Sequence, residues 1–221
     1  MSPQPDIRRD KQNNGLEVVT PSAAVQDEEP YPEEQRYRAG AYGLLASLLR
    51  TPPGVEVLSQ AVALPARAEG KDEMTVSISM LGLAARTTTE SAVNDEYHAL
   101  FIGLGRGELV PYGSWYLTGF LMEKPLSLLR DDLVALGFER SAQTREPEDH
   151  VAALCEVMAL LIAEGRSLER QSRFFETHMS PWIGRFFQDL STADNAVFYR
   201  AVGRFGSAFT NLEQRYLAME V

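Results

Sequence analysis

From Arg36 onward, apolar residues recur mostly at spacings of three and four. That spacing matches a helix that buries one face along its length. Residues 76–80 alternate like a half-buried strand, but the segment is short and further apolar residues flank it, so we interpret it as helix too. The pattern predicts an all-α protein.

Turn-forming and capping residues divide this pattern into separate helices. The first stripe ends at Thr51-Pro52-Pro53, because a proline pair cannot continue a helix. Pro125 opens a later helix, which Gly137 closes in the C-cap position. Other helices are predicted over 55–64, from a capping box at Thr87 and Glu90 to Phe101, from Pro147 to Ile162, from Ser180-Pro181 to Phe187, and from Ser191-Thr192 to Tyr216. Because no long segment repeats, we expect an irregular helical bundle and not a solenoid.

Residues 1–35 differ in composition from the rest of the chain. They hold nine hydrophobic residues, five of the twelve prolines, and eight acidic against three basic residues. A segment of this kind cannot bury enough apolar surface to fold, so we expect a disordered acidic tail. The remainder is expected to form two closely packed helical parts, 36–137 and 147–221, joined by a hinge at 138–146.

The charge balance narrows the classes of partner. Thirty-one acidic against 21 basic residues give a net charge of −10 at pH 7, which disfavours nucleic acid and anionic membranes as partners. No apolar run reaches the ~18 residues of a membrane span, and polar residues follow Arg8-Arg9, where a twin-arginine export signal would be apolar. A single cysteine, Cys155, allows no intramolecular disulfide and suits a reducing compartment. We therefore expect a cytoplasmic protein.

Candidate catalytic and metal-binding residues are few. Ser114 lacks the flanking glycines of a nucleophile elbow, and Cys155 lies on the apolar stripe of its helix, where burial leaves a thiol inert. His98, His150 and His178 do not have the spacing of a zinc motif. The glycines of residues 103–107 follow a helix and lack the lysine of a phosphate-binding loop, so we interpret them as a turn. We predict no catalytic nucleophile and no metal site.

Residues 146–150, Glu-Pro-Glu-Asp-His, place three carboxylates and an imidazole at a predicted helix start. One interpretation is structural, because acidic side chains in the first turn complement the helix dipole. The alternative is a nucleotide-dependent enzyme, similar to a GTP hydrolase, in which His150 and a neighbouring carboxylate act as base and acid. The residues alone leave both open.

A dense aromatic segment follows the glycine loop. Residues 112–120 contain four aromatic side chains and lie close in sequence to a further aromatic and apolar group at 97–101. These side chains can form core, or they can line an apolar groove with tyrosine and tryptophan at its rim. An acidic protein with such a groove suits a peptide that has a basic part and an apolar part. We place this groove in the first helical part.

Three motif segments, 96–103 (EYHALFIG), 111–116 (PYGSWY) and 146–150 (EPEDH), resemble the TorD/DmsD family of molybdoenzyme maturation chaperones in order and spacing. Phe174-Phe175 with His178 and Trp182 resembles the aromatic stretch late in that family. The resemblance extends over roughly 36–218. The acidic tail is an addition to the family pattern, and Leu104 stands where the family often has proline.

The resemblance implies a TorD-like fold and a cytoplasmic chaperone without enzymatic activity. Such a chaperone binds the twin-arginine signal peptide and the apo-form of a molybdopterin oxidoreductase, and prevents export until the cofactor is inserted. The carboxylates of Glu148 and Asp149 would pair with the two arginines while the groove takes the apolar part. The peptide-binding residues implied by the resemblance and the neighbouring sequence are Tyr97, Leu100, Phe101, Tyr112, Ser114, Trp115, Tyr116, Glu146, Pro147, Glu148, Asp149 and His150.

The resemblance also implies cofactors and partners. The molybdopterin belongs to the client and the chain needs no cofactor of its own, although weak GTP binding is proposed for some family members. Segment 119–137 and the last helix favour formate dehydrogenase as client, and dimethyl sulfoxide and trimethylamine N-oxide reductases are the other candidates. The chain would be a monomer or a dimer that exchanges domains through the hinge.

Overall fold

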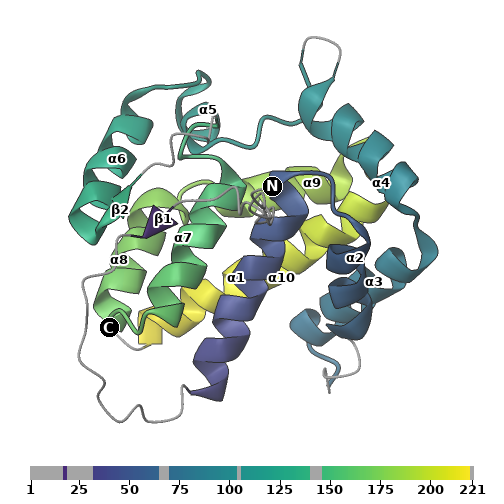
Figure 1. Cartoon of the computed structure of the whole chain (residues 1–221), viewed down its shortest axis with the longest axis horizontal. Helices are drawn as coiled ribbons and strands as arrows, with labels where there is room; N and C mark the ends of the chain where they lie inside the picture. The colour runs from purple at the N-terminus through teal and green to yellow at the C-terminus, as the bar shows by residue number, and fades with distance from the viewer. Residues whose placement is uncertain (1–16, 19–31, 65–69, 104–105, 140–145, 220–221) are drawn as a thin grey trace, which may run out of the picture.

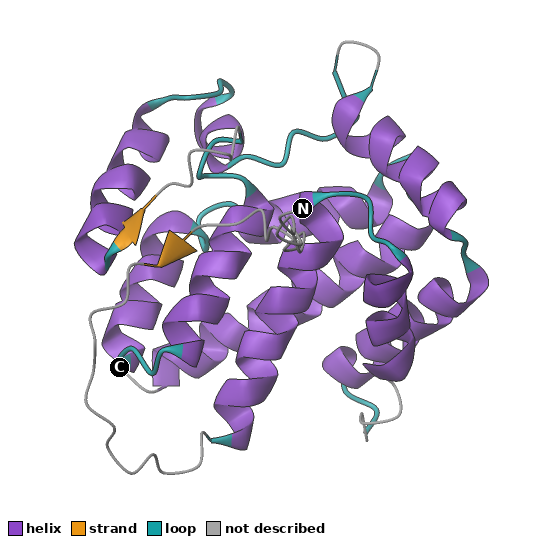
Figure 2. Ribbon diagram, in the orientation of Figure 1, coloured by secondary structure: helices purple, strands orange, loops and turns teal. Residues whose placement is uncertain are grey.

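The computed structural model describes residues 17–18, 32–64, 70–103, 106–139 and 146–219. These residues form a bundle of helices, which confirms the all-α prediction (Figure 1, Figure 2). The strands in this part of the chain are β1 (Glu17–Val18) and β2 (Phe138–Glu139), which pair antiparallel. The tail and the hinge expected from the sequence fall largely outside the described residues.

The helical elements described before the predicted hinge begin at the start of the bundle. Residues 76–80 lie in a helix, as predicted, and the first helix begins at Glu33, inside the predicted tail. Gly137 ends the last of them in a left-handed conformation, as its C-cap position predicts. These elements are α1 (Glu33–Arg50), α2 (Val55–Ala63), α3 (Glu73–Thr87), α4 (Glu90–Tyr97), the π-helix η2 (His98–Ile102), α5 (Gly113–Thr118) and α6 (Lys124–Leu136).

The helices after the predicted hinge complete the bundle. They are α7 (Val151–Ala163), α8 (Leu168–His178), α9 (Ile183–Thr192) and α10 (Phe198–Met219). Helix α1 packs on α7, and α10 packs on both α9 and α3. Elements from the two predicted helical parts therefore share one core, and Figure 1 shows the early and late helices side by side.

Specific contacts fix two helix pairs, α1 with α10 and α9 with α10. The buried guanidinium of Arg38 on α1 pairs with Glu213 on α10, and its Nε lies 2.8 Å from the carboxylate. Gly206 lets α10 approach α9 closely, because a Cβ there would lie 2.3 Å from the ring of Phe187. A larger residue at that position would force the two helices apart.

Several predicted helix starts are wrong, because the caps come from other residues. Thr87 ends α3, and the N-cap of α4 is Thr89, whose hydroxyl accepts the Ala92 N–H at 3.2 Å. The helix predicted from Pro147 begins at Val151, after His150 as N-cap. Residues 147–150 form a turn instead, which directs their side chains in different directions.

The starts of the last two helices are also displaced from the predicted positions. Ser180-Pro181 lies in a turn before α9, whose N-cap residue is Trp182. Ser191-Thr192 closes α9 and does not cap α10, which begins six residues later at Phe198. Val197, the residue directly before α10, has an apolar side chain that cannot accept a hydrogen bond.

A carboxylate from a distant helix caps α10. Glu96 on α4 accepts the backbone N–H groups of Val197, Phe198 and Tyr199 at 2.8, 3.0 and 2.7 Å. The first N–H groups of a helix have no partner within the helix, and a negative charge there also opposes the positive end of the helix dipole. Glu96, which opens the first motif segment, thus connects α4 to α10.

We predict that Glu96→Ala lowers the free energy of unfolding by about 2 kcal/mol, because three helical N–H groups lose their acceptor. Urea denaturation of the variant and the parent chain measures this difference. The matched control is Asp95→Ala, which removes an exposed carboxylate from the same helix and should change stability by less than about 0.5 kcal/mol. Equal losses in the two variants would contradict the capping role.

Candidate functional site

The second and third motif segments lie against each other. Tyr112 and His150 form an antiparallel bridge. On either side of it, the Gly113 N–H donates to the Asp149 carbonyl at 2.9 Å, and the Val151 N–H donates to the Pro111 carbonyl at 2.9 Å. The structure therefore brings the segments 111–116 and 146–150 together at the starts of α5 and α7.

Asp149 strengthens this junction from inside. Its side chain is only 3% exposed, and its Oδ2 accepts the Ser114 N–H at 2.8 Å, in the first turn of α5. Its Oδ1 and the Ser114 hydroxyl are both buried and have no hydrogen-bond partner among the described residues. The Asp149 carboxylate is thus directed at the backbone of α5 and away from the surface.

His150 is the N-cap of α7. Its Nδ1 accepts the Ala152 N–H at 3.1 Å, so the neutral ring carries its proton on Nε2. The edge of the ring packs against Tyr112, with 5.0 Å between centroids. Burial, and then the positive charge of Arg50, lower the pKa of His150 to about 3. A neutral ring with Nδ1 already bonded is poorly suited to act as the general base of the enzyme alternative.

Trp182 and His178, from the late aromatic stretch, connect α8 and the turn after it to the helices beside this junction, α5 and α6. Trp182 donates its indole N–H to the His178 carbonyl at 2.8 Å and packs on Tyr116, with 5.5 Å between centroids. A Cβ at Gly113 would lie 3.0 Å from the indole nitrogen, so glycine suits this position. His178 Nε2 lies 2.7 Å from the carboxylate of Asp132 and so connects α8 to α6.

The first motif segment contributes mainly to the core. Tyr97 and Leu100 are buried, and the Tyr97 hydroxyl donates to the Arg50 carbonyl at 3.0 Å. Phe101 packs edge-on against Tyr199 of α10, with 5.4 Å between centroids. In this segment Tyr97 therefore contacts α1 and Phe101 contacts α10, as part of the shared core.

Gly103 ends the π-helix η2 and confirms the expected turn. Its φ is +60°, and a Cβ there would lie 2.1 Å from the Arg106 carbonyl oxygen. The chain then returns along the π-helix, with the Leu109 N–H donating to the Leu100 carbonyl at 2.8 Å. Leu104, the departure from the family pattern, lies outside the described residues.

The twelve predicted peptide-binding residues differ in exposure. Those at the surface are Glu146, which is exposed, and Phe101, Tyr112, Trp115 and Pro147, which are half-buried. The other seven, Tyr97, Leu100, Ser114, Tyr116, Glu148, Asp149 and His150, are buried. The assignment of all twelve to peptide binding stays a prediction.

The three carboxylates of residues 146–150 have different surroundings. Glu148 is buried and forms an ion pair with Arg130 of α6 at 2.9 Å, in addition to other interactions. Glu146 accepts a hydrogen bond from the Tyr112 hydroxyl, and burial together with this bond raises the pKa of Tyr112. Glu146 is therefore the carboxylate of this segment that a partner can reach without breaking the fold.

Sequence reasoning missed an exposed apolar surface that begins in the last turn of α5 and continues into the loop after it. We call Leu117, Phe120, Leu121 and Met122 the apolar loop, and all four side chains are exposed, Phe120 by 68% and Met122 by 73%. Met122 has a φ of +60°, which is unfavourable for a residue with a Cβ. A cluster of exposed apolar side chains is typical of an interaction site. The signal in the sequence was the apolar run after Gly119, which has no helical period.

The described residues contain no group of three or more histidine, cysteine or acidic side chains placed to hold a metal ion. Cys155 is fully buried, and burial raises the pKa of its thiol. Among the described residues, no helix has both the length and the apolar composition needed to cross a membrane.

His150 should make stability depend on pH. An unfolded histidine has a pKa near ~6.5, so between about pH 6.5 and 3 the unfolded chain binds a proton that the folded chain does not. Stability is therefore greatest above pH 6.5 and falls as the pH decreases, by up to about 1.4 kcal/mol per pH unit for this one group.

We predict that His150→Asn, which keeps an N-cap acceptor, removes this contribution between about pH 6.5 and 5. Urea unfolding of the parent and the variant at several pH values measures the difference in slope. The matched control is His98→Asn, at an exposed histidine of η2, which should keep the parent slope. A parent slope retained in His150→Asn would contradict the assignment.

Comparison with known proteins places this arrangement in a family. The family model named nitrate reductase delta subunit matches residues 67–188, which is more than half of the chain. The chaperone protein TorD of Aliivibrio salmonicida is 28% identical over 165 residues, covering 67% of this chain and 77% of that protein. The probable Tat proofreading chaperone DmsD of Haemophilus influenzae is 31% identical over 112 residues, covering 50% of this chain and 54% of that protein.

Solved structures agree on the fold. A crystal structure of a proposed redox enzyme maturation protein from Archaeoglobus fulgidus matches with a TM-score of 0.53 at 16% identity, over 84% of this chain and 98% of that one. The order of the three motif segments had indicated the same group of proteins. The chain therefore belongs to the TorD/DmsD family of molybdoenzyme maturation chaperones.

Proposed function

We propose that this chaperone binds the twin-arginine leader of its client in the cytoplasm, with Glu146 pairing with the arginines and the apolar loop contacting the apolar part. The observation that carries the proposal is the position of these two features at opposite ends of α5. The Glu146 carboxylate accepts a hydrogen bond from Tyr112, the N-cap residue of α5. The apolar loop begins at the C-terminal end of the same helix. The six residues of α5 give this helix a length of about 9 Å.

This spacing suits the chemistry of a twin-arginine leader. Its basic start and apolar middle follow each other along the peptide, so one extended peptide can reach both ends of α5. The half-buried ring of Trp115 lies on α5 between the two features and adds aromatic surface. The name of the Haemophilus influenzae relative, a Tat proofreading chaperone, supports a leader as the ligand.

The proposal changes the roles inferred from the sequence for Asp149 and Glu148. Asp149 accepts a backbone N–H of α5, and Glu148 pairs with Arg130. A leader arginine could reach either carboxylate only by breaking these interactions and leaving a buried polar group without a partner, which is costly. We therefore assign Asp149 and Glu148 to positioning α5 and α6, and Glu146 to contacting the leader.

We also propose, from the family resemblance, the client, the absence of a cofactor and of enzymatic activity, and the oligomeric state. The client is a formate dehydrogenase, with dimethyl sulfoxide and trimethylamine N-oxide reductases as the other candidates. The molybdopterin stays with the client, the chaperone has no enzymatic activity, and a guanine nucleotide binds weakly at most. The chain acts as a monomer or as a domain-exchanged dimer.

Calorimetric titration with synthetic leaders of several molybdoenzymes tests the proposal directly. Each leader is compared with a version in which lysine replaces both arginines, because lysine cannot form the same bidentate pair with a carboxylate. We expect one leader to bind tightly and its lysine version to bind more weakly. A folded chain that binds none of the leaders would contradict leader binding.

We predict that the double substitution Phe120→Ser and Met122→Ser lowers leader affinity at least about tenfold, because two exposed apolar contacts are lost. The same calorimetric titration measures the change. The matched control is Val76→Ser with Leu83→Ser, which removes two exposed apolar side chains from α3. If the α3 variant lost as much affinity as the loop variant, the apolar loop would not be the binding surface.

We predict that Glu146→Gln lowers leader affinity about three- to tenfold and reduces its dependence on salt, because one exposed charge pair is lost. Titrations at low and high salt measure both effects, and circular dichroism confirms that the variant is folded. Glu176→Gln, at an exposed position of α8, is the control for net charge. An unchanged salt dependence in Glu146→Gln would assign the leader arginines to another carboxylate.

A further inference from the structure

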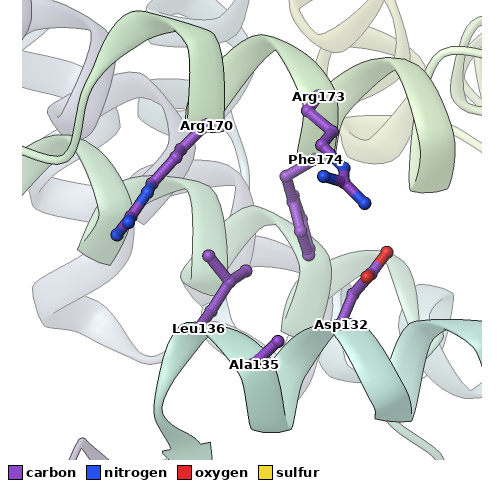
Figure 3. Close-up of a pocket in the computed structure, with 6 residues that line it drawn as sticks. All are labelled: Asp132, Ala135, Leu136, Arg170, Arg173 and Phe174. Atoms are coloured by element: carbon purple, nitrogen blue, oxygen red, sulfur yellow. The ribbon is translucent and has the colours of Figure 1, made fainter.

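A separate pocket lies between α6 and α8, with a volume of about 190 Å³ (Figure 3). The buried ring of Phe174 and the side chains of Ala135 and Leu136 form its apolar wall. Figure 3 shows Arg170 and Arg173 projecting from α8 at its rim. Asp132 is the acidic side chain that lines it, and this carboxylate is already bonded to His178.

The two arginines give this pocket a charge opposite to that of the whole protein. Both guanidinium groups are exposed, and neither has an ion-pair partner among the residues that the structure describes. Arg170 and Arg173 are three positions apart, so they lie on the same side of α8. Paired guanidinium groups beside an apolar wall suit an acidic segment that also carries small apolar residues. A basic leader would be repelled here.

The strand pair β1–β2 brings an early part of this chain close to the pocket. Val18 of β1 pairs with Phe138 of β2, and Glu17 pairs with Glu139. Because the strands are antiparallel, β1 points toward the end of α6, where Leu136 lines the pocket. Val18, the last described residue before the segment 19–31, therefore lies near the end of α6 that lines the pocket.

The other end of residues 19–31 joins α1. The first turns of α1 lie beside the end of α10, with Gln35 bonded to Tyr216 at 2.9 Å. Helix α8 contacts α7 and α10, the two long helices against which α1 packs. Figure 1 shows α8 between the strand pair and the start of α1. Thirteen residues can extend to about 40 Å, which is enough to cross α8.

The composition of this connecting segment matches the pocket. Residues 23–25 are Ala-Ala-Val, which are small and apolar, and residues 27–29 are Asp-Glu-Glu. The first group suits the wall formed by Leu136 and Phe174, and the second suits the two guanidinium groups. We propose that the pocket between α6 and α8 is the docking site for residues 23–29 of the same chain.

Disulfide trapping tests this proposal in the full chain. Gln26→Cys places a thiol in the segment without removing an acidic residue, and Ala135→Cys places one at the exposed edge of the pocket. The native Cys155 is fully buried and does not compete. Under mild oxidation, we expect an intramolecular disulfide, followed on non-reducing gels and by mass spectrometry. The control pair joins Gln26→Cys to Ser79→Cys on α3 and should react at least about tenfold more slowly.

Charge reversal separates docking from simple proximity. Arg170→Glu with Arg173→Glu should slow trapping at Ala135→Cys at least about fivefold, as should high salt. Arg86→Glu with Arg200→Glu, at exposed positions of α3 and α10, changes the net charge equally and should leave the rate unchanged. Equal rates at Ala135→Cys and Ser79→Cys, or a rate insensitive to the α8 variants, would overturn the proposal.

A disulfide between two chains would also overturn it, because the pocket would then bind the segment of a second copy. No leader peptide takes part in this experiment, so its result does not depend on the proposed function.

Discussion

Helix α7 is buried on nearly every side, and the covering of this helix determines the arrangement of the bundle. Its buried residues include the consecutive Ala152, Ala153 and Leu154, which lie about 100° apart around the helix axis and so on different faces. Helix α1 covers one side of it and α8 packs against another. The junction of residues 111–114 with 149–151 holds the N-terminal end of α7, where Val151 is fully buried. The candidate site is thus attached to the start of a helix that is buried along most of its length.

Most of the fold could be predicted from local patterns, whereas the contacts that complete it could not. The period of apolar residues gave the helical class, and Pro125 and Gly137 marked two ends of α6 because proline and glycine act through their own backbone. The cap of α10 depends instead on Glu96, a hundred residues earlier in the chain. No local pattern near residue 197 identifies a partner that only the tertiary structure brings close.

In the candidate site, too, the sequence predicted the residue types but not the direction of each side chain. The order of the motif segments indicated the family, and residue type suggested carboxylates for the arginines of a leader. The direction of each side chain depends on the turn at 147–150, which leaves Glu146 exposed and buries Asp149. Likewise, a tyrosine such as Tyr97 suits a core and a groove equally, and only its packing against the bundle distinguishes them. The apolar loop was missed because it has no periodic pattern.

The shared core has a consequence for the continuity of the chain. Helix α1 packs on α7 and α3 packs on α10, although residues 140–145 separate the members of both pairs in sequence. A cut in the backbone at that point would leave each piece with an apolar face that only the other piece covers. The two pieces should stay associated after proteolysis, and two separately expressed fragments should reassemble. The junction between α6 and α7 is therefore a place where the gene could be divided without losing the bundle.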